Sequence, residues 1–196
     1  MKDDSFVNTV IIGMSDRKTR ETDTSKTRHS IVDAANTLIA EKGLKGTSVS
    51  AVARKLGMSH ANVYRHFSSR DALLKAAAKG WMKEMRDACQ AAVGAKTVNA
   101  EKLSALVIAI RDQLTKRAVN PAALDLYDFA LREMEQDVKY HHAHRAGIVS
   151  DIVGPDTDTT AVLDALRGFT DPHLLFATDV IAAPERIRKL CDLLCR

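Results

Sequence analysis

Two glycines, at positions 43 and 57, divide the segment that follows Lys26 into stretches that each have the apolar spacing of a helix. The stretch before Gly43 carries apolar residues three or four positions apart, namely Ile31, Ala34, Ala35, Leu38 and Ile39. The next stretch carries Val49, Val52, Ala53 and Leu56, and a third carries Val63 and Phe67. Glycine readily takes the left-handed conformation that ends a helix. The pattern therefore predicts three helices over residues 26–70, the last two short and joined by a tight turn, as in a helix-turn-helix.

Hydroxyl side chains stand where the two short helices are expected to begin. Thr47 and Ser48 precede the second helix, and Ser59 precedes the third, which we expect from His60 to about His66. A side-chain oxygen at this position accepts a hydrogen bond from a free N–H group of the first helical turn.

The remainder of the chain, residues 71–196, shows longer helical stripes and no strand-like alternation. Breaks are expected near Gly94, at Pro121, at Gly154-Pro155 and at Pro184, with a kink at Pro172. Aromatic residues are only 5% of the chain, which disfavours a β-sandwich or barrel. The sequence predicts an all-α protein of about nine helices.

Several classes of protein are disfavoured by what the sequence lacks. It has no apolar run long enough to cross a membrane. Its three cysteines form no disulfide framework, so we expect a cytoplasmic protein with free thiols. It contains no G-x-S-x-G, G-x-G-x-x-G, P-loop or H-E-x-x-H motif, which argues against a common enzyme class.

Positive charge is concentrated near the N-terminus. The whole chain has a formal charge of +4. Residues 15–70 hold eleven Lys and Arg against five Asp and Glu, whereas residues 71–196 are nearly balanced. Residues 1–25 lack helical periodicity, and we interpret them as a flexible basic arm that includes Arg17, Lys18 and Arg20. A cationic module on a neutral body favours a polyanionic partner such as nucleic acid.

Residues 26–75 resemble the tetracycline-repressor (TetR) family of bacterial transcription regulators. The motif Tyr64-Arg65-His66-Phe67, followed by Ser68-Ser69-Arg70-Asp71, is especially close to the family pattern. The other matching positions are Arg28, Ile31, Ala34, Ala35, Gly43, Thr47, Ser48, Val49, Val52, Ala53, Gly57, Ser59, Leu73 and Leu74. The resemblance implies a homodimer that binds a double-stranded DNA operator, with a C-terminal domain over residues 71–196 for an effector and for dimerisation. We expect a repressor that a small molecule releases from a palindromic operator.

The DNA contacts are expected around the third helix, with His60, Ala61 and Asn62 at the tip that enters the major groove. Tyr64 and His66 resemble the phosphate-contacting pair of the family, and Phe67 is expected in the core. The full set of predicted DNA-binding residues is Thr47, Ser48, Ser59, His60, Ala61, Asn62, Tyr64, Arg65, His66 and Arg70.

An effector cavity is expected among the helices of the C-terminal domain. Its predicted lining residues are Trp81, Met85, Leu106, Ile110, Leu131, Met134 and Phe176. For the dimer contact we expect the eighth and ninth helices, using the apolar residues Val162, Leu163, Leu166, Phe169, Leu174, Leu175, Ile187 and Leu190.

Two alternatives remain open. Asp137, His141 and His144 share one helical face, and Asp171 or His173 could complete a shell for Zn²⁺ or Ni²⁺ in a metal-responsive regulator. No cofactor is otherwise required. The other alternative is a helical enzyme or carrier whose basic region is only a solvated surface.

Overall fold

The computed structural model describes residues 5–117, 122–175 and 183–195. These ranges contain only helices, which confirms the predicted all-α class. The helices are α1 (Ser5–Gly46), α2 (Val49–Leu56), α3 (His60–His66), α4 (Arg70–Gly94), α5 (Asn99–Arg117), α6 (Ala122–Glu133), α7 (Glu135–Val153), α8 (Thr159–Thr170), α9 (Pro172–Leu175) and α10 (Ala183–Leu194). None of the described helices is long and apolar enough to span a membrane.

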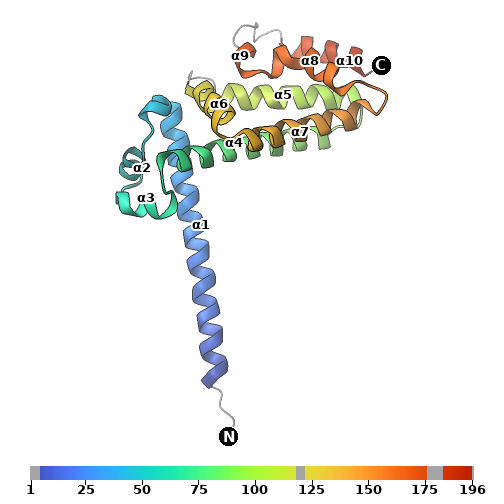
Figure 1. Cartoon of the computed structure of the whole chain (residues 1–196). Helices are drawn as coiled ribbons and strands as arrows, with labels where there is room; N and C mark the ends of the chain where they lie inside the picture. Colours follow the sequence, from blue (N-terminus) through green and yellow to red (C-terminus); the bar gives the residue numbers. More distant parts are fainter. Residues whose placement is uncertain (1–4, 118–121, 176–182, 196) are drawn as a thin grey trace.

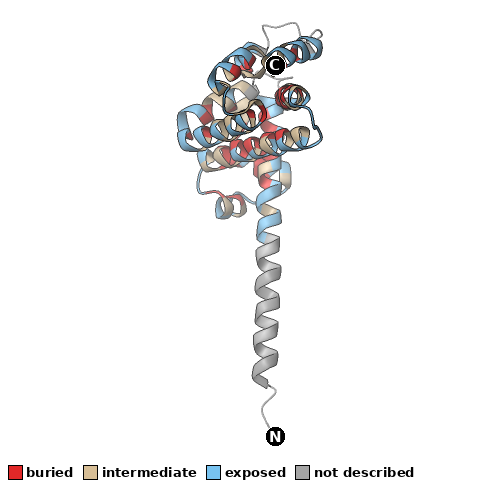
Figure 2. Cartoon of the chain, turned by 90° about the vertical axis from the view of Figure 1, so that its right-hand side faces the viewer, coloured by how far each residue is buried: buried red, intermediate tan, exposed pale blue. Residues whose placement is uncertain are grey.

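The helices form two parts that α4 connects (Figure 1). In the first part, α2 and α3 lie beside the long helix α1. In the second part, α4 to α10 pack into a helical body, and α4 runs from one part into the other. Figure 2 shows that the buried residues lie inside this body and along the facing sides of the helices. Because α4 belongs to both parts, a movement of this helix would affect both.

The first part is held together by a small apolar core. Ile31, Ala35 and Val52 are fully buried in it, and Val63 and Phe67 fix α3 against the other two helices. Leu73, from the first turns of α4, completes the cluster. The apolar spacing of the sequence thus predicts this core correctly.

The helical body has its own core and a junction with the first part. Leu103, Leu106 and Leu166 are fully buried in the body core. A separate cluster joins α1 and α4 to α6 and α7, with Ile39, Leu74, Met82, Ala130 and Val138 among its members. This junction cluster is the apolar contact between the body and the helix-turn-helix part.

The glycines and serines at the helix ends adopt the roles that the sequence predicts. Gly43 departs from helical geometry, with φ 72° and ψ 177°, and Gly57 ends α2 in the left-handed conformation at φ 63°. Ser48 and Ser59 cap α2 and α3, accepting hydrogen bonds from the backbone N–H groups of Ala51 and Asn62.

The N-terminal arm is the clearest departure from the sequence prediction. Helix α1 begins at Ser5, whereas residues 1–25 were expected to be non-helical. An established helix adds one hydrogen bond for each further residue, and no proline precedes Pro121 to stop it. The expected basic contacts from Arg17, Lys18 and Arg20 fall outside the described side chains.

The later helices differ from expectation in two places, and the break before Pro172 brings the described total to ten. Helix α7 begins at Glu135, because the backbone breaks at Met134, whereas the sequence pattern suggests a start near His141. Pro172 ends the preceding helix and starts the separate helix α9. A proline donates no backbone N–H, so it is better placed in the first turn of a helix than in its interior. The expected helix start at Pro121 lies outside the described residues.

Candidate functional site

Helix α3 presents a polar face away from its own core. His60 and Ala61 are exposed, whereas Val63, on the opposite face, is fully buried. Asn62 is partly buried, and its Oδ1 accepts a hydrogen bond from the Arg65 guanidinium at 2.5 Å. The free tip of α3 therefore carries side chains that could contact base edges in a DNA groove.

The last turn of α3 separates a surface aromatic from a core aromatic, as the sequence predicts. The Tyr64 side chain is 52% exposed, whereas Phe67 is 2% exposed. The guanidinium carbon of Arg28 lies 4.2 Å from the centre of the Phe67 ring. Tyr64 is thus free to contact a ligand, whereas Phe67 serves packing.

Thr47 occupies a different place from the one predicted. It is fully buried, and its hydroxyl donates to the carbonyl oxygen of Gly43 at 2.9 Å. A buried, already bonded hydroxyl cannot reach a DNA phosphate, so the prediction of a DNA contact through the Thr47 side chain is wrong. The residue closes the turn between α1 and α2.

Arg70 is also bonded within the chain. Its Nε donates to the carbonyl oxygen of Thr47 at 2.7 Å, and its terminal nitrogen donates to the carbonyl oxygen of Leu44. These bonds connect the start of α4 to the turn before α2. The structure assigns Arg70 a role in holding the first part together, whereas the sequence suggested a contact to the DNA backbone.

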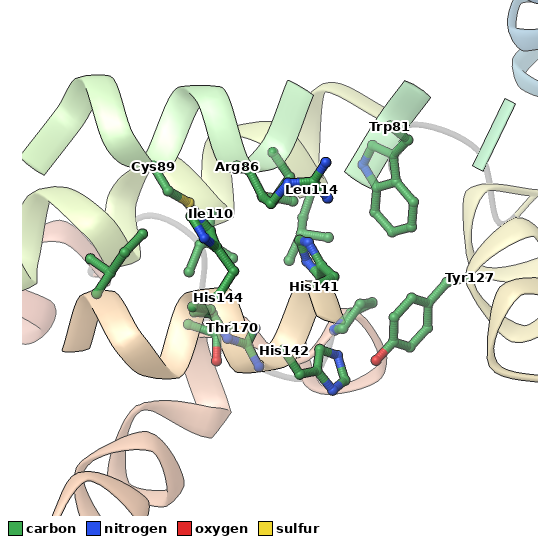
Figure 3. Close-up of a pocket in the computed structure, with 14 residues that line it drawn as sticks. Trp81, Arg86, Cys89, Ile110, Leu114, Tyr127, His141, His142, His144 and Thr170 are labelled. Atoms are coloured by element: carbon green, nitrogen blue, oxygen red, sulfur yellow. The ribbon is translucent and has the colours of Figure 1, made fainter. Parts of the chain in front are cut away.

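The helical body contains a cavity between α4, α5, α6 and α7, with about 480 Å³ of empty space that is partly open to solvent (Figure 3). Its walls mix apolar side chains with arginines and histidines. The lining residues are Trp81, Met85, Arg86, Cys89, Ile110, Leu114, Tyr127, His141, His142, His144, Arg145, Ile148, Thr170 and Pro172. The mixed lining, apolar side chains with a few polar groups, is typical of small-molecule sites in proteins.

A smaller pocket of about 280 Å³ adjoins this cavity. The two share Trp81, Met85, Tyr127, His141 and His142. The smaller pocket extends to three apolar residues that belong to the junction cluster: Met82, Ala130 and Val138. The combined space therefore has a polar end and an apolar end.

The structure brings three of the seven predicted effector residues to the cavity: Trp81, Met85 and Ile110. Leu106 is buried in the body core, and Met134 belongs to the junction cluster. Leu131 is 42% exposed, because α6 turns it outward. Phe176 lies outside the described residues.

The predicted metal ligands do not form a site. Asp137 Oδ1 lies 3.1 Å from the Lys79 ammonium, and His173 Nε2 lies 3.1 Å from Asp128 Oδ1. Asp171 pairs with Arg167 at 3.4 Å, and the His144 ring stacks on Tyr140. Across the described ranges, no group of three or more His, Cys, Asp or Glu side chains is placed to hold a metal ion. The metal prediction is therefore wrong, because the shared helical face sends these side chains to different partners.

His141 and His142 instead belong to the cavity wall, with ring centres 5.8 Å apart. Burial above all, together with the positive charges of nearby Arg145 and His142, lowers the pKa of His141 to about 4. Burial also raises the pKa of the Cys89 thiol to about 11. The histidine is thus neutral and the cysteine protonated at neutral pH, which gives the cavity no thiolate nucleophile.

Sequence reasoning missed several polar members of the cavity, including Arg86, Tyr127, Arg145 and Thr170. One signal was available on α7. His141, Arg145 and Ile148 follow one another at spacings of four and three residues, so they share a face of the helix. That face lies beside the apolar stripe of Val149 and Ile152, which enters the body core.

Three of the residues predicted for the dimer contact are used inside the single chain, whereas Leu174, which is also predicted for it, is exposed. Val162, Leu166 and Ile187 are all buried in the body core, with exposures of 2% or less. Leu174 and Leu193 are exposed on α9 and α10. The first three residues therefore cannot form an intermolecular contact without leaving their own core.

Comparisons with known proteins agree with the helix-turn-helix part. Residues 31–77 match the family described as bacterial regulatory proteins, tetR family. The chain is 34% identical over 110 residues to the HTH-type transcriptional regulator BetI of Rhizobium meliloti. The aligned region covers 55% of this chain and 54% of BetI. The match thus spans about half the length of that relative.

A second relative is the HTH-type transcriptional repressor KstR2 of Mycolicibacterium smegmatis, 24% identical over 73% of this chain and 75% of KstR2. Among solved structures, the fold is similar to that of FadR from Bacillus subtilis in complex with stearoyl-CoA. The TM-score is 0.63 at 19% identity, over 83% of this chain and 96% of FadR. These relatives are described as transcriptional regulators. The capped helix-turn-helix thus lies in the part of the chain, residues 31–77, that matches the bacterial regulatory proteins of the tetR family. The chain as a whole has a fold similar to that of the FadR structure.

Proposed function

We propose that this protein is a sequence-specific DNA-binding transcriptional regulator, a repressor that leaves its operator when a small molecule occupies the cavity of the helical body. The observation that carries the proposal is the placement of His60, Ala61 and Asn62 at the exposed tip of α3. Their side chains differ in hydrogen-bonding capacity, which direct base reading requires. Asn62 could pair with an adenine, and Ala61 could contact a thymine methyl group.

Other residues around α3 would hold the DNA backbone. The exposed Tyr64 and Arg65 and the partly buried His66 lie on α3 itself. Ser48 and Ser59 lie at helix starts, where free N–H groups favour phosphate oxygens. Such contacts position the protein on the duplex, whereas base contacts select the sequence.

The protein would act as a homodimer on a palindromic operator. Two copies related by a twofold axis would place their α3 helices about one duplex turn apart, ~34–36 Å. Exposed Leu174 and Leu193 make the surface of α9 and α10 the favoured contact. We place the protein in the bacterial cytoplasm, associated with the nucleoid, and assign it neither catalytic activity nor a required cofactor.

Release would follow from a shift between two conformations of the dimer. An occupant of the cavity would contact α4 through Trp81 and α6 through Tyr127. Helix α4 continues into the first part, and α6 packs on α1. A change at the cavity could therefore alter the spacing of the two α3 helices. The FadR structure, which has a similar fold, was solved in complex with stearoyl-CoA, and this supports the proposal that a small molecule acts on this protein.

Selection of binding sites from a pool of random duplexes tests the proposal. The purified protein should enrich an inverted repeat whose half-sites are separated by one turn of DNA. Enrichment of no sequence over the starting pool would contradict sequence-specific regulation. A dimer mass in light scattering should accompany the enrichment.

A further inference from the structure

Four buried nitrogen atoms at the cavity lack hydrogen-bond partners in the described part of the chain. They are Trp81 Nε1, His141 Nδ1, His144 Nε2 and Arg145 Nε. All four residues line the same cavity. Burying a polar group without a partner is costly, and most such groups in folded proteins are satisfied. Their concentration in one cavity indicates a site that is completed by another molecule.

The charge of the cavity indicates what kind of molecule would bind there. Two arginines, Arg86 and Arg145, line it, and no carboxylate is among its described lining residues. Burial lowers the pKa of Arg145, and the weaker attractions of Tyr127, Cys89 and Asp171 do not offset this effect. An arginine remains a cation at neutral pH, so the cavity holds a positive charge that is poorly compensated.

Among the described residues, Asp171 is a carboxylate that acts on Arg145, and it has other partners. Its carboxylate accepts hydrogen bonds from Arg167 Nε at 3.4 Å and from the backbone N–H of His173 at 2.8 Å. Water could satisfy the free N–H groups, but it carries no charge. An anion could accept these hydrogen bonds and also compensate the positive charge, because a guanidinium forms charge-assisted hydrogen bonds with carboxylate and phosphate groups.

The other end of the cavity is apolar. Met85, Ile110 and Leu114 line the main space. The adjoining pocket continues toward Met82 and Val138 of the junction cluster. A ligand that filled both spaces would place an apolar portion against the contact between the body and the helix-turn-helix part.

We propose that the effector is an amphiphilic organic anion, with a carboxylate or phosphate group at Arg145 and an apolar chain directed toward Met82 and Val138. This inference rests on the proposed function and specifies its effector. The neutral imidazole of His141 and the unpartnered Nε2 of His144 would add hydrogen bonds to the anionic group. A cationic ligand is disfavoured by both arginines.

Trp81 is the single tryptophan of the chain, so its fluorescence reports on the cavity alone. We would titrate the full-length protein, without DNA, with decanoate, decyl phosphate, decanol and decyltrimethylammonium below their micelle concentrations. The two anions should bind roughly tenfold or more tightly than decanol, and the ammonium compound should bind least. The comparison of decanoate with decyl phosphate separates the two sources of negative charge. Equal binding of alcohol and anions would overturn the proposal.

Variants test the role of Arg145 directly. Arg145→Gln should remove the preference for anions over decanol, whereas Arg132→Gln, on the exposed surface of α6, should retain it. Arg145→Met serves as a second variant, because it removes the buried charge and keeps an apolar side chain of similar length. It should have a higher Tm than the parent without ligand and show no anion preference. Retained preference in either Arg145 variant would overturn the proposal.

The same ligands, added to the protein–DNA complex, connect the two proposals. Dissociation by the anions alone supports the effector assignment. Anion binding at Trp81 without any effect on the DNA complex would contradict the effector role. Equal binding of neutral and anionic ligands, with specific operator binding intact, would overturn the ligand class and leave the proposed regulator in place.

Discussion

Arg70 Nε donates a hydrogen bond to the backbone carbonyl oxygen of Thr47 at 2.7 Å, joining the start of α4 to the turn before α2. The same guanidinium also donates to Leu44. The helix that leads into the cavity is therefore attached to the helix-turn-helix part by side-chain bonds as well as by chain continuity. We interpret this link as the connection through which α4 moves the DNA-binding helices.

Replacing Arg70 distinguishes this structural role from a direct DNA contact. Arg70→Gln should destabilise the protein by about 1–3 kcal/mol, because hydrogen bonds from a charged donor to two carbonyl groups are lost. Thermal unfolding followed by circular dichroism measures the change. As a control, Arg65→Gln on α3 should weaken DNA binding with little loss of stability. If Arg70→Gln left the Tm unchanged and only weakened DNA binding, the structural assignment would be contradicted.

Asn62 and Tyr64 should affect DNA binding in different ways. Asn62→Ala should cost about 1–3 kcal/mol on the preferred operator and relax the preference at one base position. Tyr64→Phe should weaken binding to all sequences by a similar factor, because a phosphate contact carries no base preference. Fluorescence anisotropy on the operator and on single-base variants measures both effects. A uniform loss for Asn62→Ala would show that this residue does not read a base.

Gly57 should be sensitive to substitution for a purely conformational reason. It has a φ of 63°, and a Cβ atom at this position would meet no atom within 4 Å. Gly57→Ala should therefore cost about 1–2 kcal/mol through backbone strain alone. Gly80→Ala, in the interior of α4 with equally open space, should stabilise the protein by roughly 0.5–1 kcal/mol. Chemical denaturation of both variants measures the contrast, and equal effects of the same sign would refute this explanation.

Stability should decrease at mildly acidic pH because of His141. Burial and nearby cations lower its pKa in the folded chain from 6.5 to about 4. Between these two pH values the unfolded chain binds more protons than the folded chain. The contribution of neutral His141 to the free energy of unfolding is therefore complete above pH 6.5, and it decreases as the pH drops toward 4.

Substitution of His141 shows whether this residue causes the loss of stability at acidic pH. Scanning calorimetry between about pH 7 and about pH 5 should show a falling Tm, and His141→Gln should reduce that fall. His29→Gln, on the exposed face of α1, should leave it unchanged. A fall of the same size in His141→Gln and in the parent would exclude His141 as the titrating group.

Local signals explain why the sequence predicts the helix-turn-helix part well. Gly57 and Ser59 act on their own turns, and the apolar spacing of Val52 and Val63 determines which side of each short helix is buried. The position of Thr47 just before α2 predicts a surface residue that contacts DNA. Its burial depends on packing between elements, which local sequence does not show.

The cavity was harder to predict, because its residues come from separate helices. Arg145 has the sequence appearance of a solvated charge, and its burial results from the packing of α7 against α4 and α5. The predicted ligands share a helical face, yet Asp137 pairs with Lys79 while His141 and His144 line the cavity. Helical spacing identifies neighbours on one helix and leaves their partners on other helices undetermined.

The most direct test of sequence-specific reading by α3 is the ratio of affinities for the selected operator and for a scrambled duplex, measured by anisotropy at one fixed salt concentration. The parent protein should bind the operator about a thousandfold or more tightly than the scrambled duplex. Asn62→Ala should lower this ratio and leave the affinity for the scrambled duplex nearly unchanged. Equal affinity of the parent for both duplexes would contradict the account.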